Sequence, residues 1–434
     1  MKPNSIHRRE FLRRAAGFAA LAGAPSLVPA TVLGGEGALS PSERITYGLV
    51  GCGARGRDLL KSFLPLPQGR CLAVCDPFAD RRERAWQMAE DHGHTGCTAT
   101  GDFRNLIARK DIDALIIATQ DHWHALIAVA AAKAGKHLYC EKPLGVSHRE
   151  SRSIRDAVRA AKVVFQTGTQ QRSDRRFRHA CEVARNGYIG RIHTVEVASE
   201  GPNYKPSYQG PLDPQPVPPG LDWEMYLGPA PRKPYNPGRH GWPDWYLIWD
   251  YCYGFIVNWG VHHLDIALWG CPQLAAETFA VEATTTYRNE GFTDNVNEWR
   301  ATFTWPSGLK MSFTDWDKQK PGCKFIGDEG WVYVDRPTFE AEPASLLTLK
   351  LKDSDTRLHR SEHHGLDFLN SVRRGTDPVS DVDAGHRATY LGMVADIAGR
   401  LKRPLRFDPV REDFVSDAEA SARLDRPMRE PWKL

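Results

Sequence analysis

Cysteine is scarce in this sequence, and its few copies lack the spacing of a metal or redox site. Nine cysteines are scattered over 434 residues, their number is odd, and no C-x-x-C pair occurs. This pattern argues against a disulfide scaffold and against a structural zinc site. An H-E-x-x-H spacing is missing as well, so no metal is expected. Cys71 and Cys75 stand in an apolar run, where cysteine packs as a small buried side chain.

Long apolar runs and clusters of charge of one sign are missing too. No apolar run reaches the length that crosses a bilayer, so no stable membrane span is expected. The formal net charge is only +4, and lysine and arginine do not gather on one element, which argues against a nucleic-acid partner. The composition has 41% apolar residues, which is enough for a buried core and for more than one domain.

The N-terminus combines a basic start with a short, mildly apolar stretch. Arg8 and Arg9 precede Phe11, residues 15–24 are rich in alanine and glycine, and small residues follow near Ala30. Such an order is typical of a signal peptide, and the paired arginines resemble the twin-arginine (Tat) export signal. We therefore expect residues 1–34 to be a Tat-type signal peptide read by the Tat machinery. The mature protein would then be periplasmic in a Gram-negative bacterium. The alternative is a disordered basic tail.

Residues 40–167 alternate short apolar runs with amphipathic stretches. Gly135 follows one predicted helix as a C-cap, and Ser147 with Glu150 forms a predicted capping box at the start of another. Alternation of strands and helices predicts a parallel sheet covered on both faces, as in a Rossmann domain. The predicted strands are 45–50, 72–74, 113–118, 137–140 and 163–166, and the predicted helices are 57–64, 80–91, 122–134 and 147–160.

Residues 168–434 follow a different pattern. Consecutive strands separated by turns predict an antiparallel sheet, so this part is expected to be a second α/β domain that binds substrate. Residues 201–241 are rich in proline, glycine and tyrosine and are predicted to form a long functional loop. The predicted strands are 192–198, 279–287, 299–305, 309–315 and 331–334, and the predicted helices are 175–185, 260–269, 365–373 and 383–401.

A glycine motif lies between the first predicted strand and helix. It reads Gly51-Cys52-Gly53-Ala54-Arg55-Gly56. The first glycine permits a tight turn, the second lets the backbone approach a pyrophosphate, and the third allows close helix packing. The helix N-terminus adds free N–H groups for the phosphates. Asp76 ends the next strand, where a carboxylate would bind ribose and favour NAD, while Arg81 and Arg82 keep NADP possible.

Two further turns follow strand ends and are expected to line the same cofactor site. The first is Thr119-Gln120-Asp121-His122-Trp123-His124, and the second is Glu141-Lys142-Pro143. Ligands of open parallel sheets bind beyond the carboxyl ends of the strands. A partly desolvated lysine beside a nicotinamide ring would have a lowered pKa and could exchange protons. His122 and His124 are either catalytic or helix-capping residues.

Together these motifs resemble the Gfo/Idh/MocA oxidoreductase family. The resemblance rests on residues 51–56, 119–124, 134–137, 141–143, 168–172 and 260–265. It implies a Rossmann domain followed by a C-terminal α/β domain on an open, largely antiparallel sheet, and a homo-oligomer formed through that sheet. It also implies that Lys142 is the catalytic lysine and that Glu141, Thr119 and His124 belong to the cofactor site.

The same resemblance singles out Asn258 and His262. The family has an Asp-x-x-x-His signature, and here it reads Asn258-Trp259-Gly260-Val261-His262. A carboxylate would orient the imidazole and stabilise its cation, but an amide carries no charge. We therefore expect His262 to be less basic than in relatives with aspartate. This favours Lys142 over His262 as the proton acceptor. Asp265 either supports His262 or serves packing.

The substrate is expected between the last Rossmann strand and the aromatic-rich region. Gln170, Gln171 and Arg172 follow residues 163–166 and are predicted to project into an interdomain cleft. Trp249 and His263 are predicted to contact the substrate, because aromatic faces suit sugar C–H surfaces and histidine reaches hydroxyls.

The sequence thus predicts an NAD(P)-dependent oxidoreductase that acts on a sugar, glycoside or polyol. An exported enzyme would carry its cofactor tightly held, because free nicotinamide nucleotide is a cytosolic resource. One alternative is a glycosidase, lyase or epimerase that uses NAD catalytically through transient oxidation. A second alternative is a non-catalytic sugar-binding protein on the same fold.

Overall fold

The computed structural model describes residues 40–201, 204–315, 317 and 319–434. The predicted signal segment 1–34 lies outside the described residues. The chain divides into two units, Met1–Arg44 and Ile45–Leu434, and both β-sheets belong to the second. In the described part, no helix combines the length and the apolar character needed to cross a membrane.

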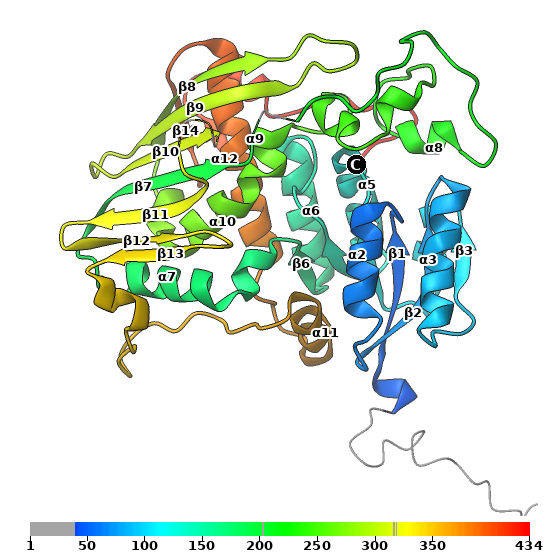
Figure 1. The fold of residues 1–434 in the computed structure, drawn as a ribbon, viewed down its shortest axis with the longest axis horizontal. Helices are drawn as coiled ribbons and strands as arrows, with labels where there is room; N and C mark the ends of the chain where they lie inside the picture. Colours follow the sequence, from blue (N-terminus) through cyan, green and yellow to red (C-terminus); the bar gives the residue numbers. More distant parts are fainter. Residues whose placement is uncertain (1–39, 202–203, 316, 318) are drawn as a thin grey trace, which may run out of the picture. The chain divides into compact units, whose positions relative to one another are not determined.

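A six-stranded parallel sheet forms the first half of the unit Ile45–Leu434, as predicted. The strand order is β3-β2-β1-β4-β5-β6. Successive strands are added on one side of β1 up to β3 and on its other side from β4 onward, while all strands stay parallel. Helices α2 and α3 lie beside β1 and β2, as Figure 1 shows. The strands are β1 (Ile45–Val50), β2 (Gly69–Cys75), β3 (Thr98–Thr100), β4 (Ala114–Ile117), β5 (His137–Cys140) and β6 (Phe165–Thr167). The helices are α2 (Ala54–Phe63), α3 (Ala79–Asp91), α4 (Phe103–Ala108), α5 (Asp121–Lys133) and α6 (His148–Ala161).

Local signals explain where two of these helices begin and end. Gly135 follows α5 with φ +77°, the left-handed conformation that glycine adopts without strain. Ser147 caps α6, because its Oγ accepts the Glu150 N–H at 3.2 Å. The reciprocal bond of the predicted capping box is different. The Glu150 carboxylate accepts from the N–H of Val146 at 2.6 Å and not from Ser147.

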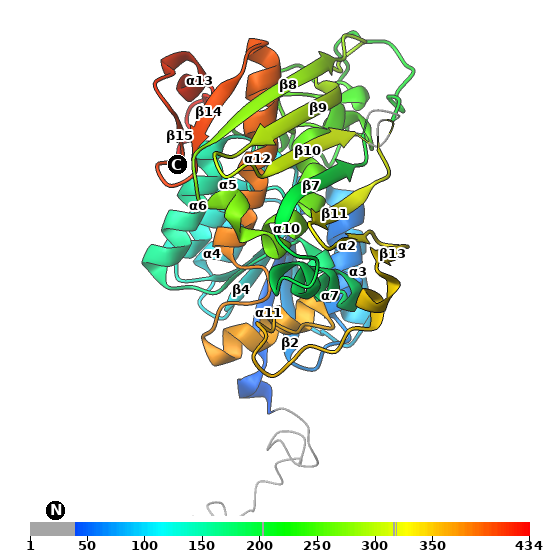
Figure 2. The same ribbon diagram turned by 90° about the vertical axis from the view of Figure 1, so that its left-hand side faces the viewer.

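A nine-stranded open sheet forms the second half, in the order β13-β12-β11-β7-β10-β9-β8-β14-β15. β7 and β10 pair in parallel, and the other neighbours are antiparallel, so the sheet is largely antiparallel as predicted. Figure 2 shows this sheet in front of α10 and α12. The strands are β7 (Ile192–Ser199), β8 (Phe279–Tyr287), β9 (Val296–Thr304), β10 (Lys310–Asp315), β11 (Gly322–Gly327), β12 (Gly330–Val334), β13 (Phe339–Glu342), β14 (Leu405–Asp408) and β15 (Asp413–Phe414).

The helices of this half supply the apolar residues that cover the sheet. Residues of α7, α10 and α12 form one buried core with residues of β7–β11, including Phe177, Leu264, Met393 and Phe313. The helices are α7 (Arg175–Arg185), α8 (Trp223–Leu227), α9 (Phe255–Asn258), α10 (Gly260–Gly270), α11 (His364–Arg374), α12 (Val382–Leu401) and α13 (Ala418–Ala422). Short elements such as β3, β13 and β15 were not predicted, because two to four residues carry too little periodicity.

Residues 204–253, here called the cover segment, lie against the Rossmann domain. They include α8 and short 3-10 turns, so the predicted loop is not wholly irregular. The N–H of Ala79 donates to Gly220 O at 2.8 Å, and the N–H of Asp222 donates to Pro77 O at 3.1 Å. Phe78 packs in one buried cluster with Trp223 and other aromatic residues of the segment. The predicted loop is therefore a fixed wall beside the end of β2.

The last ten residues, here called the C-terminal tail, hold the cover segment in place. The N–H of Arg429 donates to Pro229 O at 2.8 Å, and its side chain donates to the carbonyl oxygens of Gly228 and Ala230. The ring of Trp432 meets Trp123 of α5 edge to face, with 4.8 Å between centroids. The chain end lies beside α5 and α8 (Figure 1). The tail thus links the cover segment to the Rossmann domain.

Polar contacts also join the two halves. Glu412, before β15, forms ion pairs with Arg152 and Arg155 of α6 and accepts from His386 of α12 at 3.0 Å. His148 lies 3.9 Å from the same carboxylate, so the group could in principle hold a metal ion. The two guanidinium groups already neutralise the carboxylate, which disfavours a cation there. All nine cysteines are buried, and none forms a disulfide in the described chain.

Candidate active site

The predicted glycine turn lies between β1 and α2 and has the geometry of a phosphate-binding turn. Gly51 has φ +94°, and a Cβ there would meet the backbone of Ala118 at 2.5 Å. A Cβ on Gly56 would meet Gly51 O at 1.8 Å, so helix and turn approach as closely as glycine permits. Gly53 borders open space, with no atom within 4 Å of a Cβ. The N-terminus of α2, at Ala54, therefore faces room for a pyrophosphate, and the residues fit a dinucleotide.

Asp76 lies at the end of β2, as predicted, and its carboxylate is buried. Its oxygens accept the N–H groups of Cys52 at 2.7 Å and Phe78 at 2.9 Å. Burial raises the pKa of Asp76 above its usual value, although Arg81 and these two N–H groups oppose the rise. Arg82 turns inward and donates to Asp76 O at 3.0 Å, whereas the Arg81 guanidinium lies 3.7 Å above the Phe78 ring.

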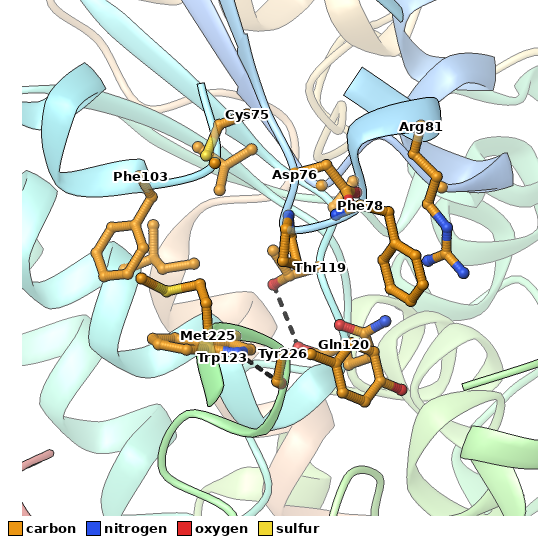
Figure 3. Close-up of a pocket in the computed structure, with 17 residues that line it drawn as sticks. Cys75, Asp76, Phe78, Arg81, Phe103, Thr119, Gln120, Trp123, Met225 and Tyr226 are labelled. Carbon is orange, nitrogen blue, oxygen red and sulfur yellow. Dashed lines mark hydrogen bonds between the residues drawn. The ribbon is translucent and has the colours of Figure 1, made fainter. Parts of the chain in front are cut away.

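A narrow cavity extends from Asp76 toward α5, and Met225 and Tyr226 of the cover segment form part of its wall. Figure 3 shows Phe78 and Arg81 on one side, Phe103 on the other, and Met225, Trp123 and Tyr226 beneath. The indole N–H of Trp123 donates to Tyr226 O at 3.1 Å, which ties the cover segment to this wall. An apolar slot next to a strand-end carboxylate has the character of an adenosine site.

The main cleft, of about 920 Å³, continues from this cavity and runs between the two halves. Both spaces are bordered by Gly53, Arg81, Ala118, Thr119 and Gln120, so they adjoin each other. The predicted residues that line the main cleft are Gly53, Ala54, Arg55, Thr119, His124, Glu141, Lys142, Gln170, Asn258 and His262. The structure thus brings both sets of predicted catalytic and cofactor residues to one place.

Lys142 lies after β5 with its ammonium group held by Asn258 at the end of α9. Its Nζ donates to Asn258 O at 2.9 Å and to Asn258 Oδ1 at 2.6 Å. Burial lowers the pKa of Lys142 below its ordinary value, while Glu141 and Asp121 pull in the opposite direction. A lysine with a lowered pKa on the wall of a cleft is suited to accept and return a proton.

Asp121, the first residue of α5, stands behind Asn258. The amide Nδ2 of Asn258 donates to both carboxylate oxygens of Asp121 at 2.9 Å. Because a carboxylate only accepts, this contact sets the amide orientation and turns its oxygen toward Lys142. Asp121 is 1% exposed, and burial raises its pKa above the usual value. Sequence reasoning quoted this residue within its turn but assigned it no role.

His262 lines the cleft without a carboxylate partner. Its Nδ1 has no hydrogen-bond partner among the described residues. Burial places its pKa well below the usual value, and the nearby Lys142 and Arg336 add to the decrease. Asp265 does not support it, because that carboxylate forms a paired contact with Arg172 at 2.7 Å through both oxygens. We expected a weakly basic His262, and burial together with two nearby cations lowers its pKa in that direction.

Glu141 and Arg55 form an ion pair on the Rossmann side of the cleft. Oε1 of Glu141 accepts from Arg55 at 2.7 Å and from the Gln170 amide at 3.0 Å. Burial alone would raise the pKa of Glu141, but the charges of Arg55 and Lys142 outweigh it and hold the pKa low. A Cβ on Gly168 would lie 2.7 Å from this carboxylate. The pair thus fixes the backbone around Lys142.

His124 has a positioning role here. Its Nδ1 lies 2.7 Å from Pro143 O and its Nε2 lies 3.1 Å from Thr119 O. The imidazole therefore links the two strand-end turns of the cofactor site. His122 is deeper, with ring nitrogens 3.3 Å from Tyr251 O and 3.2 Å from Tyr226 O, and burial lowers its pKa to about 4. Neither ring is placed as a general base.

Four predicted substrate residues lie away from the main cleft. Arg172 is buried against Asp265, and Gln171 contacts His263 at 3.1 Å, because residues 170–173 turn into the C-terminal domain. Trp249 packs under Arg426, 3.2 Å from its ring centroid, so its aromatic face serves the C-terminal tail. His263 faces Ala198 O at 2.8 Å and borders a second cavity.

Several side chains that line the cleft had no individual role assigned from the sequence, although Tyr246 and Trp259 stand in the aromatic-rich region expected near the substrate. They include Asp121, Trp242, Tyr246, Trp259 and Arg336. Trp242 is 50% exposed and meets Tyr246 edge to face, with 4.6 Å between centroids. The local excess of aromatics was the available signal, but it did not distinguish the face toward the cleft from the face toward the core. Arg336 follows β12, and no motif or spacing in the sequence pointed to it.

Two family models match the chain. One is described as the NAD-binding Rossmann fold of an oxidoreductase family and covers residues 45–169. The other is described as the C-terminal alpha/beta domain of an oxidoreductase family and covers residues 176–434. Together they span nearly the whole unit that contains the two sheets.

Individual proteins are more distant. Myo-inositol 2-dehydrogenase of Thermotoga maritima is 22% identical over 379 residues, 84% of this chain and 98% of that protein. A glycosyl hydrolase family 109 protein of Saccharopolyspora erythraea is 33% identical over 161 residues, 34% of this chain and 35% of that protein. The crystal structure of an aldose-aldose oxidoreductase from Caulobacter crescentus, complexed with glycerol, has a TM-score of 0.63 at 17% identity and covers 84% of this chain and 100% of that one. At such identity the structural likeness concerns the fold.

Proposed function

Because the chain belongs to the Gfo/Idh/MocA oxidoreductase family, we propose that it oxidises a carbinol carbon of a carbohydrate. The substrate would lie in the main cleft between Lys142 and the aromatic pair Trp242 and Tyr246. NAD, when bound along the glycine turn, supplies the acceptor for the hydride of that carbon. The relative named myo-inositol 2-dehydrogenase supports a polyhydroxylated substrate.

The contact between Lys142 and Asn258 is the observation that carries the proposal. Lys142 would take the hydroxyl proton as a neutral amine while the carbon loses its hydride, and it would return the proton in the reverse direction. Asn258 keeps Nζ at one position with two hydrogen bonds of 2.9 and 2.6 Å. His262, with its low pKa, would then donate or accept a hydrogen bond to a substrate hydroxyl without taking its proton.

We further propose NAD over NADP and a cofactor that is retained. The buried Asp76 would repel a 2′-phosphate, which supports NAD, although Arg81 borders the same cavity. Met225 and Tyr226 of the cover segment border the adenosine end, and the C-terminal tail holds that segment beside α5, so we expect slow release of the nucleotide. Retention suits export of the folded holoprotein through the Tat route, to the periplasm, which the arginine pair suggests. A homo-oligomer through the nine-stranded sheet is part of the same proposal.

A second candidate is a glycosidase, lyase or epimerase that uses NAD catalytically. A retained cofactor favours it, because such an enzyme returns the nucleotide to its starting state in each turnover. The relative named as a glycosyl hydrolase family 109 protein adds support. In that reaction Lys142 would still move the hydroxyl proton of the transiently oxidised carbon.

The experiment is to denature the purified protein, identify the released nucleotide, and assay the holoprotein with a panel of polyols, monosaccharides and glycosides. NAD at about one equivalent and turnover that Lys142→Ala removes would support the proposal. Lys133→Ala, on the exposed end of α5, is the matched control. Cleavage of a glycoside with no net reduced nucleotide would favour the second candidate. A protein that neither contains nor binds a nicotinamide nucleotide would overturn both, and turnover unaffected by Lys142→Ala would overturn the proton route.

A further inference from the structure

A second cavity of about 250 Å³ opens beside the main cleft, inside the C-terminal domain. It borders Trp259, His262 and Arg336, which also line the main cleft. Its other polar walls come from Glu200, after β7, and Asp335, after β12. We call it the side cavity. It is smaller than the roughly 300–1,000 Å³ of pockets for drug-sized ligands, so it suits one ring.

The polar side chains of the side cavity form a mixed set of acceptors and donors. Arg336 approaches Glu200 at 3.7 Å, too far for a strong hydrogen bond. Asp335 faces His263 Nε2 at 3.2 Å. Burial alone would raise the pKa of Asp335, but the contact with His263 and the charge of Arg336 outweigh it and hold the pKa low. A low pKa favours the ionised form of Asp335, and the carboxyl groups of Asp335 and Glu200 both have capacity to accept further hydrogen bonds.

This composition selects among ligand classes. Two carboxylates would repel a phosphate, sulfate or uronate group in a cavity with one guanidinium. A purely apolar ligand would offer no hydrogen bond to Glu200, Asp335 or Arg336, whose contacts within the protein leave donor and acceptor capacity unused. A neutral group with several hydroxyls satisfies both conditions, because hydroxyls donate to carboxylates and accept from guanidinium.

An aromatic edge separates the side cavity from the main cleft. A ring centroid of the Trp259 indole lies 5.2 Å from Arg336, which borders both spaces, and 5.6 Å from Lys142 Nζ, which borders the main cleft. Its Nε1 and the Nδ1 of His262 have no hydrogen-bond partner among the described residues. Buried polar groups are normally satisfied, so two neighbouring exceptions at this edge mark a place for a polar ligand.

We propose that the side cavity is a subsite for a second sugar ring, so that the substrate is a disaccharide or a glycoside with a hydroxylated aglycone. The reacting ring occupies the main cleft at Lys142, and the glycosidic link crosses the edge formed by Trp259 and His262. This inference rests on the proposed function, since it assigns the substrate class of the same site.

The test measures kcat/KM of the holoprotein for cellobiose, maltose and lactose against glucose and galactose. The variants are Glu200→Gln and Asp335→Asn, which keep size and remove the charged acceptor. Each bond from a hydroxyl to a charged group contributes enough for about a tenfold effect. We expect at least one disaccharide to exceed its monosaccharide about tenfold, and each variant to reduce that ratio toward one. Arg191→Ala, at the exposed residue before β7, is the control and leaves both rates unchanged.

The outcomes separate this inference from the proposed function. Equal kcat/KM for monosaccharides and disaccharides, or variants that lower both rates equally, would overturn the subsite while the oxidoreductase activity stands. Absence of turnover with every sugar, in a protein that retains NAD, would count against the proposed function itself. In that case isothermal titration calorimetry of the same sugars still shows whether the side cavity binds a second ring. Tighter binding of a disaccharide that Asp335→Asn removes would support it, and equal binding would refute it.

Discussion

The amide of Asn258 donates to both carboxylate oxygens of Asp121, at 2.9 Å each, and presents its own oxygen to Lys142 at 2.6 Å. The family resemblance places an aspartate at position 258, next to the lysine. Here the negative charge is on Asp121 of α5, which reaches Lys142 only through the Asn258 side chain. Lys142 therefore contacts a neutral acceptor that a buried carboxylate orients, which favours a lower pKa than direct contact with a charge.

Asp121→Asn tests this arrangement. Without the carboxylate, the Asn258 amide loses its orientation and can turn its Nδ2 toward Lys142. We expect kcat/KM to fall about tenfold or more, the cost of a misplaced hydrogen bond to a charged group. The charge of Asp121 raises the pKa of Lys142. Its removal lowers that pKa further, so the rise of the oxidation rate with pH moves to lower pH. A pH profile of kcat/KM measures both effects.

The control for this change is Asp328→Asn, an exposed side chain in the C-terminal domain. It is expected to leave the profile in place. A pH limb at the same position in Asp121→Asn and in the unaltered protein would contradict the coupling through Asn258.

His262→Asn distinguishes the two candidate proton acceptors. The pKa of His262 lies well below its ordinary value, so the ring is neutral throughout the range near pH 7. We expect a loss of about tenfold, from one hydrogen bond, whereas Lys142→Ala costs about 10²–10⁴-fold, the range of general acid–base catalysis. Steady-state kinetics of both variants with the same substrate checks the order. A larger loss for His262→Asn would assign the proton to the histidine.

Trp432→Ala probes retention of the cofactor. The Trp432–Trp123 contact holds the C-terminal tail on α5, and the tail holds the cover segment over the adenosine cavity. An aromatic pair contributes roughly 0.5–1.5 kcal/mol beyond burial, so nucleotide release should accelerate about three- to tenfold. The measurement is loss of bound nucleotide during dialysis. Trp331→Ala, on β12, is the matched control. Equal rates of nucleotide release from both variants would show that the C-terminal tail does not retain the cofactor.

Glu412→Gln tests the polar link between α6 and α12. His386 and Arg155 hold the pKa of Glu412 below its ordinary value, even though burial raises it. A depressed folded pKa contributes stability that is present above the unfolded value of 4.5 and is lost as pH falls below it. Since Arg152 is partly exposed, we expect a cost of about 2 kcal/mol at pH 7. Urea unfolding at pH 7 and pH 4 should show a smaller difference at pH 4.

Glu329→Gln, on the exposed turn between β11 and β12, controls for loss of charge alone. A difference between Glu412→Gln and the unaltered protein that grows on acidification would contradict the sign of this linkage.

Sequence reasoning was most successful where local geometry and chemistry coincide. The positive φ of Gly51 and the contact between Gly56 and Gly51 follow from a strand–turn–helix connection that only glycine allows. Lys142 could be placed because it directly follows a buried strand, and parallel strand ends converge at one edge. Trp249 was misplaced because the aromatic pattern of residues 242–269 is compatible with either face. Its neighbour Arg426 lies 177 residues away in the chain.

The sequence alone determined the two sheet architectures, the glycine turn and the position of Lys142 at a strand end, since each depends on residues close together in the chain. The tertiary structure decided which groups surround that lysine. Asp121 and Asn258 are 137 residues apart, Arg336 enters from β12, and the tail closes over α5. Such contacts depend on how the two halves pack, and no local period or motif encodes that packing.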